Sequence, residues 1–141
     1  CLLGCSLSSL LALRSLVFFP GTFSHYILGS PSLPLGQSLF DEEKQQASVY
    51  APVAETHRTG LIILAGEGEG TIQGGGNNIP RESHRMLQRL RSRNCVTCDM
   101  RLVASEDHDT LKPSLVSGGL GWLEGRMAAT DASKRRRGGG S

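Results

Sequence analysis

Two cysteines separated by two residues, Cys95 and Cys98, are the closest match in this chain to a metal-binding or redox motif. This spacing allows two thiolates to bind one zinc ion, but a tetrahedral zinc site needs two further ligands. The other cysteines lie far upstream, and His84 and His108 are the nearest histidines, each a single residue. No βαβ pattern frames a redox pair, and incidental or disulfide-forming thiols are the simpler interpretation. We therefore predict no metal site and no cofactor, with Cys95, Cys98, His84 and His108 as the only candidate zinc ligands.

A glycine-rich stretch at residues 66–76 follows an apolar run, as phosphate-binding loops do. A dinucleotide fingerprint would need glycine where Thr71 or Gln73 stands. Glu67 and Glu69 would also place carboxylates where phosphate charge must lie. The pattern therefore predicts a flexible loop without a nucleotide.

Catalytic signatures are missing from the sequence in their usual form. It contains no G-x-S-x-G nucleophile elbow and no H-E-x-x-H zinc motif. The acidic run around His108, residues 106–109, lacks the further ligands and the glycine of a calcium loop, so it predicts a solvated turn. We therefore predict that the chain is not an enzyme and takes no small-molecule substrate.

Charge is distributed unevenly along the chain. The formal net charge is +2, made up of −3 over residues 1–79 and +5 over residues 80–141. A basic half of this kind is typical of segments that bind polyanions. We predict contact with nucleic acid or an anionic membrane through residues 80–101 and 134–137. The expected polyanion-binding residues are Arg81, Arg85, Arg89, Arg91, Arg93, Lys134, Arg135, Arg136 and Arg137.

One amphipathic helix is expected at about residues 80–93. Asn78 is a suitable N-cap, and Pro80 stands where a first-turn proline is welcome. At 100° per residue the arginines recur on one side and an apolar stripe forms on the other. The stripe consists of Ile79, Met86, Leu87 and Leu90.

The N-terminal segment, residues 1–28, is the most apolar part of the chain. It is long enough to cross a bilayer, but Arg14 and several serines interrupt it. It also lacks the basic region that opens a secretory signal. Two interpretations stay open: a signal or membrane anchor, or a plain apolar helix or collapsed segment.

The composition predicts a mostly irregular, disordered, low-complexity chain. It has 18 glycines and 6 prolines among 141 residues, and aromatic residues make up only 5%. We expect at most a small unstable β-hairpin, built from the strand candidates at residues 48–53 and 61–64. Four segments are expected: the apolar segment 1–28, a Gly/Ser/Pro-rich linker 29–79, the basic helix and cysteine pair 80–105, and a flexible tail 106–141.

Three hypotheses about function follow. The first is a non-enzymatic basic interaction segment that binds a polyanion. The second is a small secreted or membrane-anchored polypeptide led by the N-terminal segment. The third is a fragment, or the product of a reading frame never selected for folding, since arginine is unusually common and the sequence starts at Cys1. The sequence assigns no compartment and no oligomeric state.

Overall fold

The computed structural model describes residues 1–33, 37–45, 58–70, 78–93 and 95–138 of the chain; of Gln37, Glu43 and residues 134–138 only the backbone is described. These residues form a four-stranded sheet in the order β1-β2-β3-β4, with every neighbouring pair parallel. The strands are β1 (Leu2–Cys5), β2 (His25–Gly29), β3 (Thr59–Gly66) and β4 (Val96–Val103). The helices are α1 (Leu7–Phe18), α2 (Gln37–Gln45), the short 3-10 helix η3 (Glu67–Gly70), α4 (Ile79–Arg91) and α5 (Leu111–Gly138).

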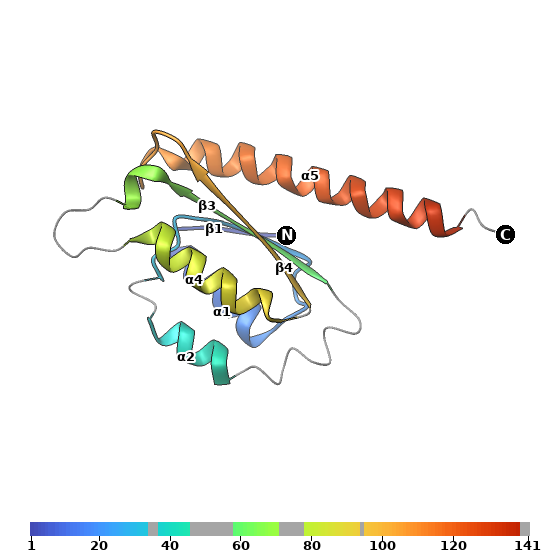
Figure 1. The fold of residues 1–141 in the computed structure, drawn as a ribbon, viewed down its shortest axis with the longest axis horizontal. Coiled ribbons are helices and arrows are strands. Elements are labelled where there is room, and N and C mark those ends of the chain that lie inside the picture. The colour runs from blue at the N-terminus through green and yellow to red at the C-terminus, as the bar shows by residue number, and fades with distance from the viewer. Residues whose placement is uncertain (34–36, 46–57, 71–77, 94, 139–141) are drawn as a thin grey trace.

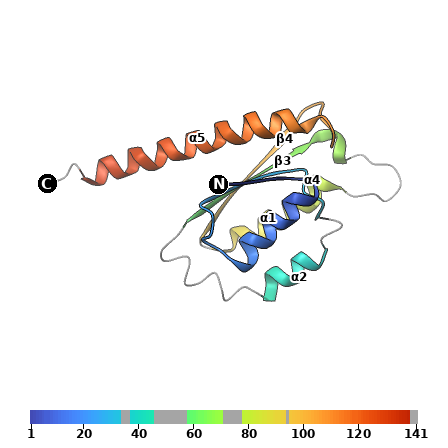
Figure 2. The ribbon, with the colours of Figure 1, turned by 180° about the vertical axis from the view of Figure 1, so that it is seen from behind.

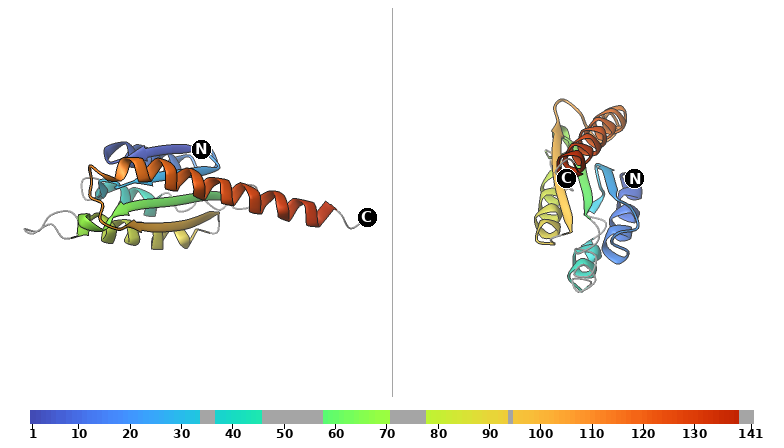
Figure 3. Two further views of the ribbon diagram at one scale, coloured as in Figure 1. Left: turned by 90° about the horizontal axis from the view of Figure 1, so that it is seen from above. Right: turned by 90° about the vertical axis from the view of Figure 1, so that its right-hand side faces the viewer.

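Helices cover both faces of this sheet (Figure 1). The helices α1, α2 and α4 lie on one side, and α5 runs alone across the other side and extends beyond the strands (Figures 1 and 3). From behind, β1 and α1 lie nearest the viewer, at one edge of the sheet (Figure 2). This is the three-layer arrangement that parallel strands require, because each crossover leaves a helix on a face.

The central strands are apolar on both sides. Tyr26 and Leu28 of β2 belong to the core under α1, α2 and α4, whereas Ile27 between them packs under α5. Leu61 and Ile63 of β3 likewise face the first core, and Ile62 faces the second. Alternate residues of a strand point to opposite faces, so a continuous apolar run is what a strand buried between two layers needs.

The predicted fold class is therefore wrong: the chain is a compact α/β structure with a parallel sheet, and it is not mostly disordered. The N-terminal segment is not one apolar helix either. It makes β1, α1 and β2, and part of its apolar residues, among them Leu13, Leu16 and Val17, belong to the core, whereas Leu11 and Phe19 are exposed. Among the residues that the structure describes, no helix is long and apolar enough to cross a membrane.

The last segment forms the helix α5 in place of the expected flexible tail, and its glycines do not prevent the helix. Gly119 packs so closely on β2 that a Cβ there would come within 2.4 Å of Ile27 Cγ2. Pro113 stands at the third position of the helix, where the missing N–H has no helical partner to lose. These residues permit close packing and a helix start, and they do not interrupt the helix.

The helix expected near residues 80–93 is present as α4. Asn78 Oδ1 accepts a hydrogen bond of 2.9 Å from the Arg81 backbone N–H, which satisfies one of the free donors at the helix start. The expected stripe of Ile79, Met86, Leu87 and Leu90 is buried. Contact with the sheet thus makes α4 a core helix with one solvated face.

The four expected segments do not coincide with the elements. The boundary at residue 28 falls inside β2, and the boundary at residue 79 falls at the first residue of α4. The strand candidate at residues 48–53 lies outside the described residues, and the run at residues 61–64 is the centre of β3.

Candidate active site

Polar side chains follow the ends of all four strands. Ser6 comes directly after β1, Ser30 directly after β2, Glu69 within η3 after β3, and His108 in the turn after β4. The carboxyl ends of parallel strands meet at one edge of a sheet, where α/β proteins place their binding sites. The topology therefore brings four distant chain segments to one place.

Ser6 occupies the sharp turn between β1 and α1. Its backbone has φ 55° and ψ −121°, a conformation that costs energy for any residue but glycine. Gly4 makes this turn possible, since a Cβ there would lie 2.8 Å from the carbonyl oxygen of Ser8. Ser6 is the N-cap residue of α1, yet its hydroxyl makes no capping hydrogen bond. The hydroxyl is directed away from its own helix and toward the site.

Glu69 is a buried acid, with only 3% of its side chain exposed. Its Oε2 accepts hydrogen bonds from Ser30 Oγ at 2.7 Å and from the Gly66 backbone N–H at 2.9 Å. Two donors thus bond to Oε2, and Oε1 can accept a hydrogen bond from a third donor. Buried carboxyl groups are tolerated only when their oxygens are satisfied in this way.

His108 connects Glu69 to Ser6. Its Nδ1 lies 2.8 Å from Glu69 Oε1, and its Nε2 lies 2.9 Å from Ser6 Oγ. A carboxylate can only accept hydrogen bonds, so Nδ1 carries the proton and donates a hydrogen bond to Glu69. Nε2 is then unprotonated and accepts a hydrogen bond from the Ser6 hydroxyl. The imidazole therefore has the tautomer that can remove a proton from Ser6.

The turn that carries His108 is fixed by Asp107. Its Oδ1 accepts from the backbone N–H groups of Asp109 and Thr110, each at 3.0 Å, and from Thr110 Oγ1 at 3.1 Å. These hydrogen bonds, with the Thr110 backbone contributing most, lower the pKa of the Asp107 carboxyl. Asp107 thereby caps the start of α5 and sets the position of the neighbouring imidazole.

A donor for negative charge also lies next to Ser6. Leu7 is the first residue of α1, and the N–H groups of a first helical turn have no partner within the helix. In hydrolases with a nucleophile on a strand-to-helix turn, the N–H after the nucleophile supplies one half of the oxyanion hole. The positive end of the α1 dipole acts in the same direction.

The predicted zinc candidates do not come together. Cys95 and Cys98 are buried in the core beneath α4, and burial raises the pKa of both thiols, that of Cys98 to about 12. His84 is exposed on α4, where its Nε2 lies 3.1 Å from Gln88 Nε2. Within the part of the chain that the structure describes, no three or more His, Cys, Asp or Glu residues form a group that could hold a metal.

The predicted polyanion-binding arginines lie on and after α4, and several contact the protein itself. The guanidinium groups of Arg85 and Arg89 stack on the Phe40 ring of α2, at 4.8 and 5.5 Å from its centroid. Arg91 donates to the carbonyl of Cys98. Arg81 is exposed, Arg93 is half-buried, and the side chains of Lys134, Arg135, Arg136 and Arg137 lie outside what the structure describes.

No sequence pattern predicts Ser6, Glu69 and His108 as one site. The signal in the sequence was Gly4-Cys5-Ser6-Leu7-Ser8, which differs from G-x-S-x-G only at its last position. The sequence patterns instead suggest that Glu69 excludes phosphate and that His108 lies in a solvated turn or serves as a candidate zinc ligand.

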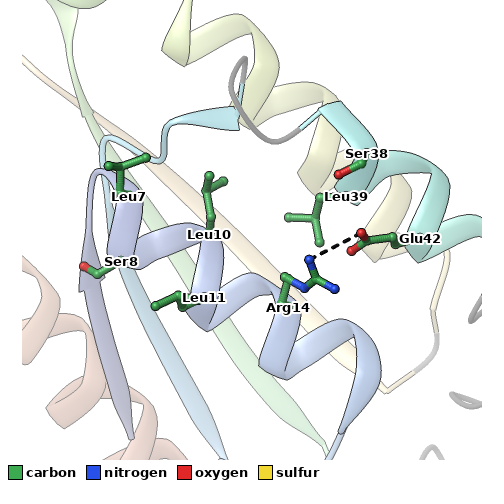
Figure 4. Close-up of a pocket in the computed structure, with 8 residues that line it drawn as sticks. All are labelled: Leu7, Ser8, Leu10, Leu11, Arg14, Ser38, Leu39 and Glu42. Carbon is green, nitrogen blue, oxygen red and sulfur yellow. Dashed lines mark ion pairs between the residues drawn. The ribbon is translucent and has the colours of Figure 1, made fainter.

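A recess with a volume of about 460 Å³ lies between α1 and α2 (Figure 4). Leucines line much of it, and Arg14 pairs with Glu42 across it at 3.4 Å. Leu7 reaches its wall, but Ser6, Glu69 and His108 do not line it. The recess is therefore separate from the three residues that could do chemistry.

Solved structures of two hydrolases share this fold. The chain matches the siderophore hydrolase EstB from Aspergillus nidulans with a TM-score of 0.69 and 21% identity, over 83% of this chain and 46% of that one. It matches the siderophore hydrolase EstA from the same organism with a TM-score of 0.61 and 21% identity, over 86% of this chain and 46% of that one. The chain thus spans about half the length of either hydrolase. No protein-family model matches the chain, and no curated protein does.

These neighbours overturn the predicted function. A non-enzymatic basic segment that binds a polyanion does not account for a compact parallel α/β fold shared with two hydrolases. The predictions of no enzyme and no small-molecule substrate are corrected on the same finding, because both neighbours are hydrolases. The physical reason is that the basic pattern belongs to the solvated face of a core helix.

Proposed function

We propose that this chain carries the catalytic residues of a serine hydrolase that cleaves carboxylic esters. The observation that supports it is the continuous hydrogen-bonded row from Glu69 through His108 to Ser6, with both distances below 3 Å. A nucleophile, a base and an acid that orients the base are the three groups that this chemistry requires. Their order along the chain, Ser, Glu, His, is that of α/β-hydrolases.

The reaction begins with Ser6. Its Oγ attacks the ester carbonyl carbon while its proton passes to His108 Nε2, and the carbonyl oxygen becomes an oxyanion beside the Leu7 N–H. The intermediate then breaks the bond to the leaving oxygen, which takes the proton from His108 and departs as an alcohol. The acyl group stays on Ser6.

Water completes the cycle. It gives a proton to His108 and attacks the acyl carbon, and the second intermediate releases a carboxylic acid as Ser6 Oγ recovers the proton. Glu69 stabilises the imidazolium that forms in each half of the reaction, since its carboxylate is buried against Nδ1.

A siderophore is the first natural substrate to test, because both structural neighbours are described as siderophore hydrolases. Small activated esters test the chemistry itself. They need little binding and report directly on nucleophile, base and oxyanion donor.

The proposal is tested by covalent labelling of the intact chain with a fluorophosphonate, followed by peptide mass spectrometry, and by hydrolysis of p-nitrophenyl acetate. We expect one label per chain, on Ser6, and a loss of about 10³-fold or more in kcat/KM for Ser6→Ala. The matched control is Ser117→Ala, which removes an exposed hydroxyl of α5 that bonds only to its own helix. Equal labelling of the wild type and Ser6→Ala would show that Ser6 is not the nucleophile.

A further inference from the structure

A second hydroxyl touches the nucleophile. Ser32 Oγ lies 3.2 Å from Ser6 Oγ, in the loop that follows β2. The Ser32 backbone N–H also bonds to the Ser6 carbonyl oxygen at 3.4 Å, and only 9% of Ser32 is exposed. Ser32 is therefore joined to Ser6 through both its backbone and its side chain.

The direction of the side-chain hydrogen bond follows from the proton count. The Ser6 hydroxyl has one proton, which it donates to His108 Nε2 at 2.9 Å. Ser6 Oγ can then only accept from Ser32, so the Ser32 hydroxyl is the donor. Its acceptor is the atom that loses a proton when the reaction starts.

A donor placed there has two effects. It fixes the Ser6 side chain in the orientation that faces His108, which keeps the reacting atoms aligned. It also strengthens as the proton leaves, because a hydrogen bond to an oxygen that gains negative charge is stronger than one to a neutral hydroxyl.

The loop after β2 contacts both ends of the hydrogen-bonded chain Glu69–His108–Ser6. Ser30, two residues before Ser32, donates to Glu69 Oε2 at 2.7 Å. The two hydroxyls differ in what they touch: Ser30 acts on the acid and Ser32 on the nucleophile. A role in loop packing alone would not place the Ser32 donor on the reacting oxygen.

We propose that Ser32 is a further catalytic residue, whose hydroxyl donates to Ser6 Oγ and promotes its deprotonation by His108. This inference rests on the proposed serine hydrolase function. It gives Ser32 a role in the rate of the chemical step and none in ester binding, so kcat is expected to change while KM is not.

The test compares Ser32→Ala, Ser32→Thr and Ser117→Ala in the intact chain by fluorophosphonate labelling rate, by kcat and KM for p-nitrophenyl acetate, and by thermal unfolding. We expect Ser32→Ala to lower both the labelling rate and kcat about tenfold with KM unchanged, because the bond that strengthens during proton transfer is lost. Ser32→Thr keeps the hydroxyl and should restore most of the rate, and Ser117→Ala should behave as the wild type.

A folded Ser32→Ala protein that reacts at the wild-type rate would overturn the role of Ser32. If Ser32→Ala does not fold, Ser32→Cys keeps the size with a weaker donor, and a wild-type rate for that variant would overturn it equally. Both outcomes differ from failure of the hydrolase proposal, in which the wild-type chain itself takes no label on Ser6.

Discussion

The helix α4 is defined by residues within the helix and its cap, whereas the turn between β1 and α1 is defined by contacts with residues far along the chain. All that defines α4, its cap, its apolar stripe and its arginines, stands within residues 78–93. The turn at Ser6 depends on partners far along the chain. His108 lies 102 residues from Ser6 in the sequence, and Glu69 lies 39 residues from His108. A local pattern therefore predicts a helix, whereas a site built from distant segments becomes visible only in the tertiary fold.

The largest effect should come from the acid. In Glu69→Gln the amide nitrogen can donate to His108 Nδ1 and so favour the wrong tautomer, with Nε2 protonated and facing Ser6. We expect kcat for p-nitrophenyl acetate to fall about 10⁴-fold, the size seen when a triad acid becomes an amide.

The matched control for that variant is Glu67→Gln, in the same short helix but exposed. It should keep the wild-type rate. A Glu69→Gln protein as active as Glu67→Gln would show that Glu69 is not the acid that orients His108.

The next effect should come from the turn itself. A methyl group at Gly4 would lie 2.8 Å from the backbone oxygen of Ser8, so Gly4→Ala must displace the start of α1. We expect a loss of about 1–3 kcal/mol in the free energy of unfolding, measured by urea denaturation, together with loss of fluorophosphonate labelling. Gly121→Ala is the control: nothing lies within 4 Å of its added Cβ, and it should be neutral or stabilising because alanine favours helices.

The smallest effect should come from α4. Asn78→Ala removes the 2.9 Å cap to the Arg81 N–H and the 3.2 Å hydrogen bond from Asn78 Nδ2 to the Gly70 carbonyl oxygen. It should lower the free energy of unfolding by about 1 kcal/mol. Arg81→Gln keeps the backbone donor of that cap and should change stability by less than about 0.5 kcal/mol. A loss of stability in Arg81→Gln as large as that in Asn78→Ala would contradict the assignment of the effect to the cap.

Burial explains which strands the sequence reveals. The run Leu61–Leu64 was visible because it is short, apolar and bounded by Gly60 and Gly66. The strands β1 and β2 were hidden in a longer apolar segment. The strand β2 is buried on both faces and therefore has no alternation to mark it, and β1 is a short edge strand of four residues. The long helix α5 was hidden by its glycines. Two of them, Gly118 and Gly119, pack against Leu64 and Ile27 of the sheet, and these contacts depend on the tertiary fold.

The sequence by itself determined α4, because a cap, a first-turn proline and a period of 3.6 residues all act within one or two helical turns. It also contained Gly4-Cys5-Ser6-Leu7-Ser8, which differs from G-x-S-x-G at one residue. Only the tertiary structure decided that Ser6, Glu69 and His108 work together, because parallel pairing brings the ends of β1, β3 and β4 to one edge of the sheet. Hydrogen bonds of about 3 Å depend on that pairing, and no spacing along the chain encodes them.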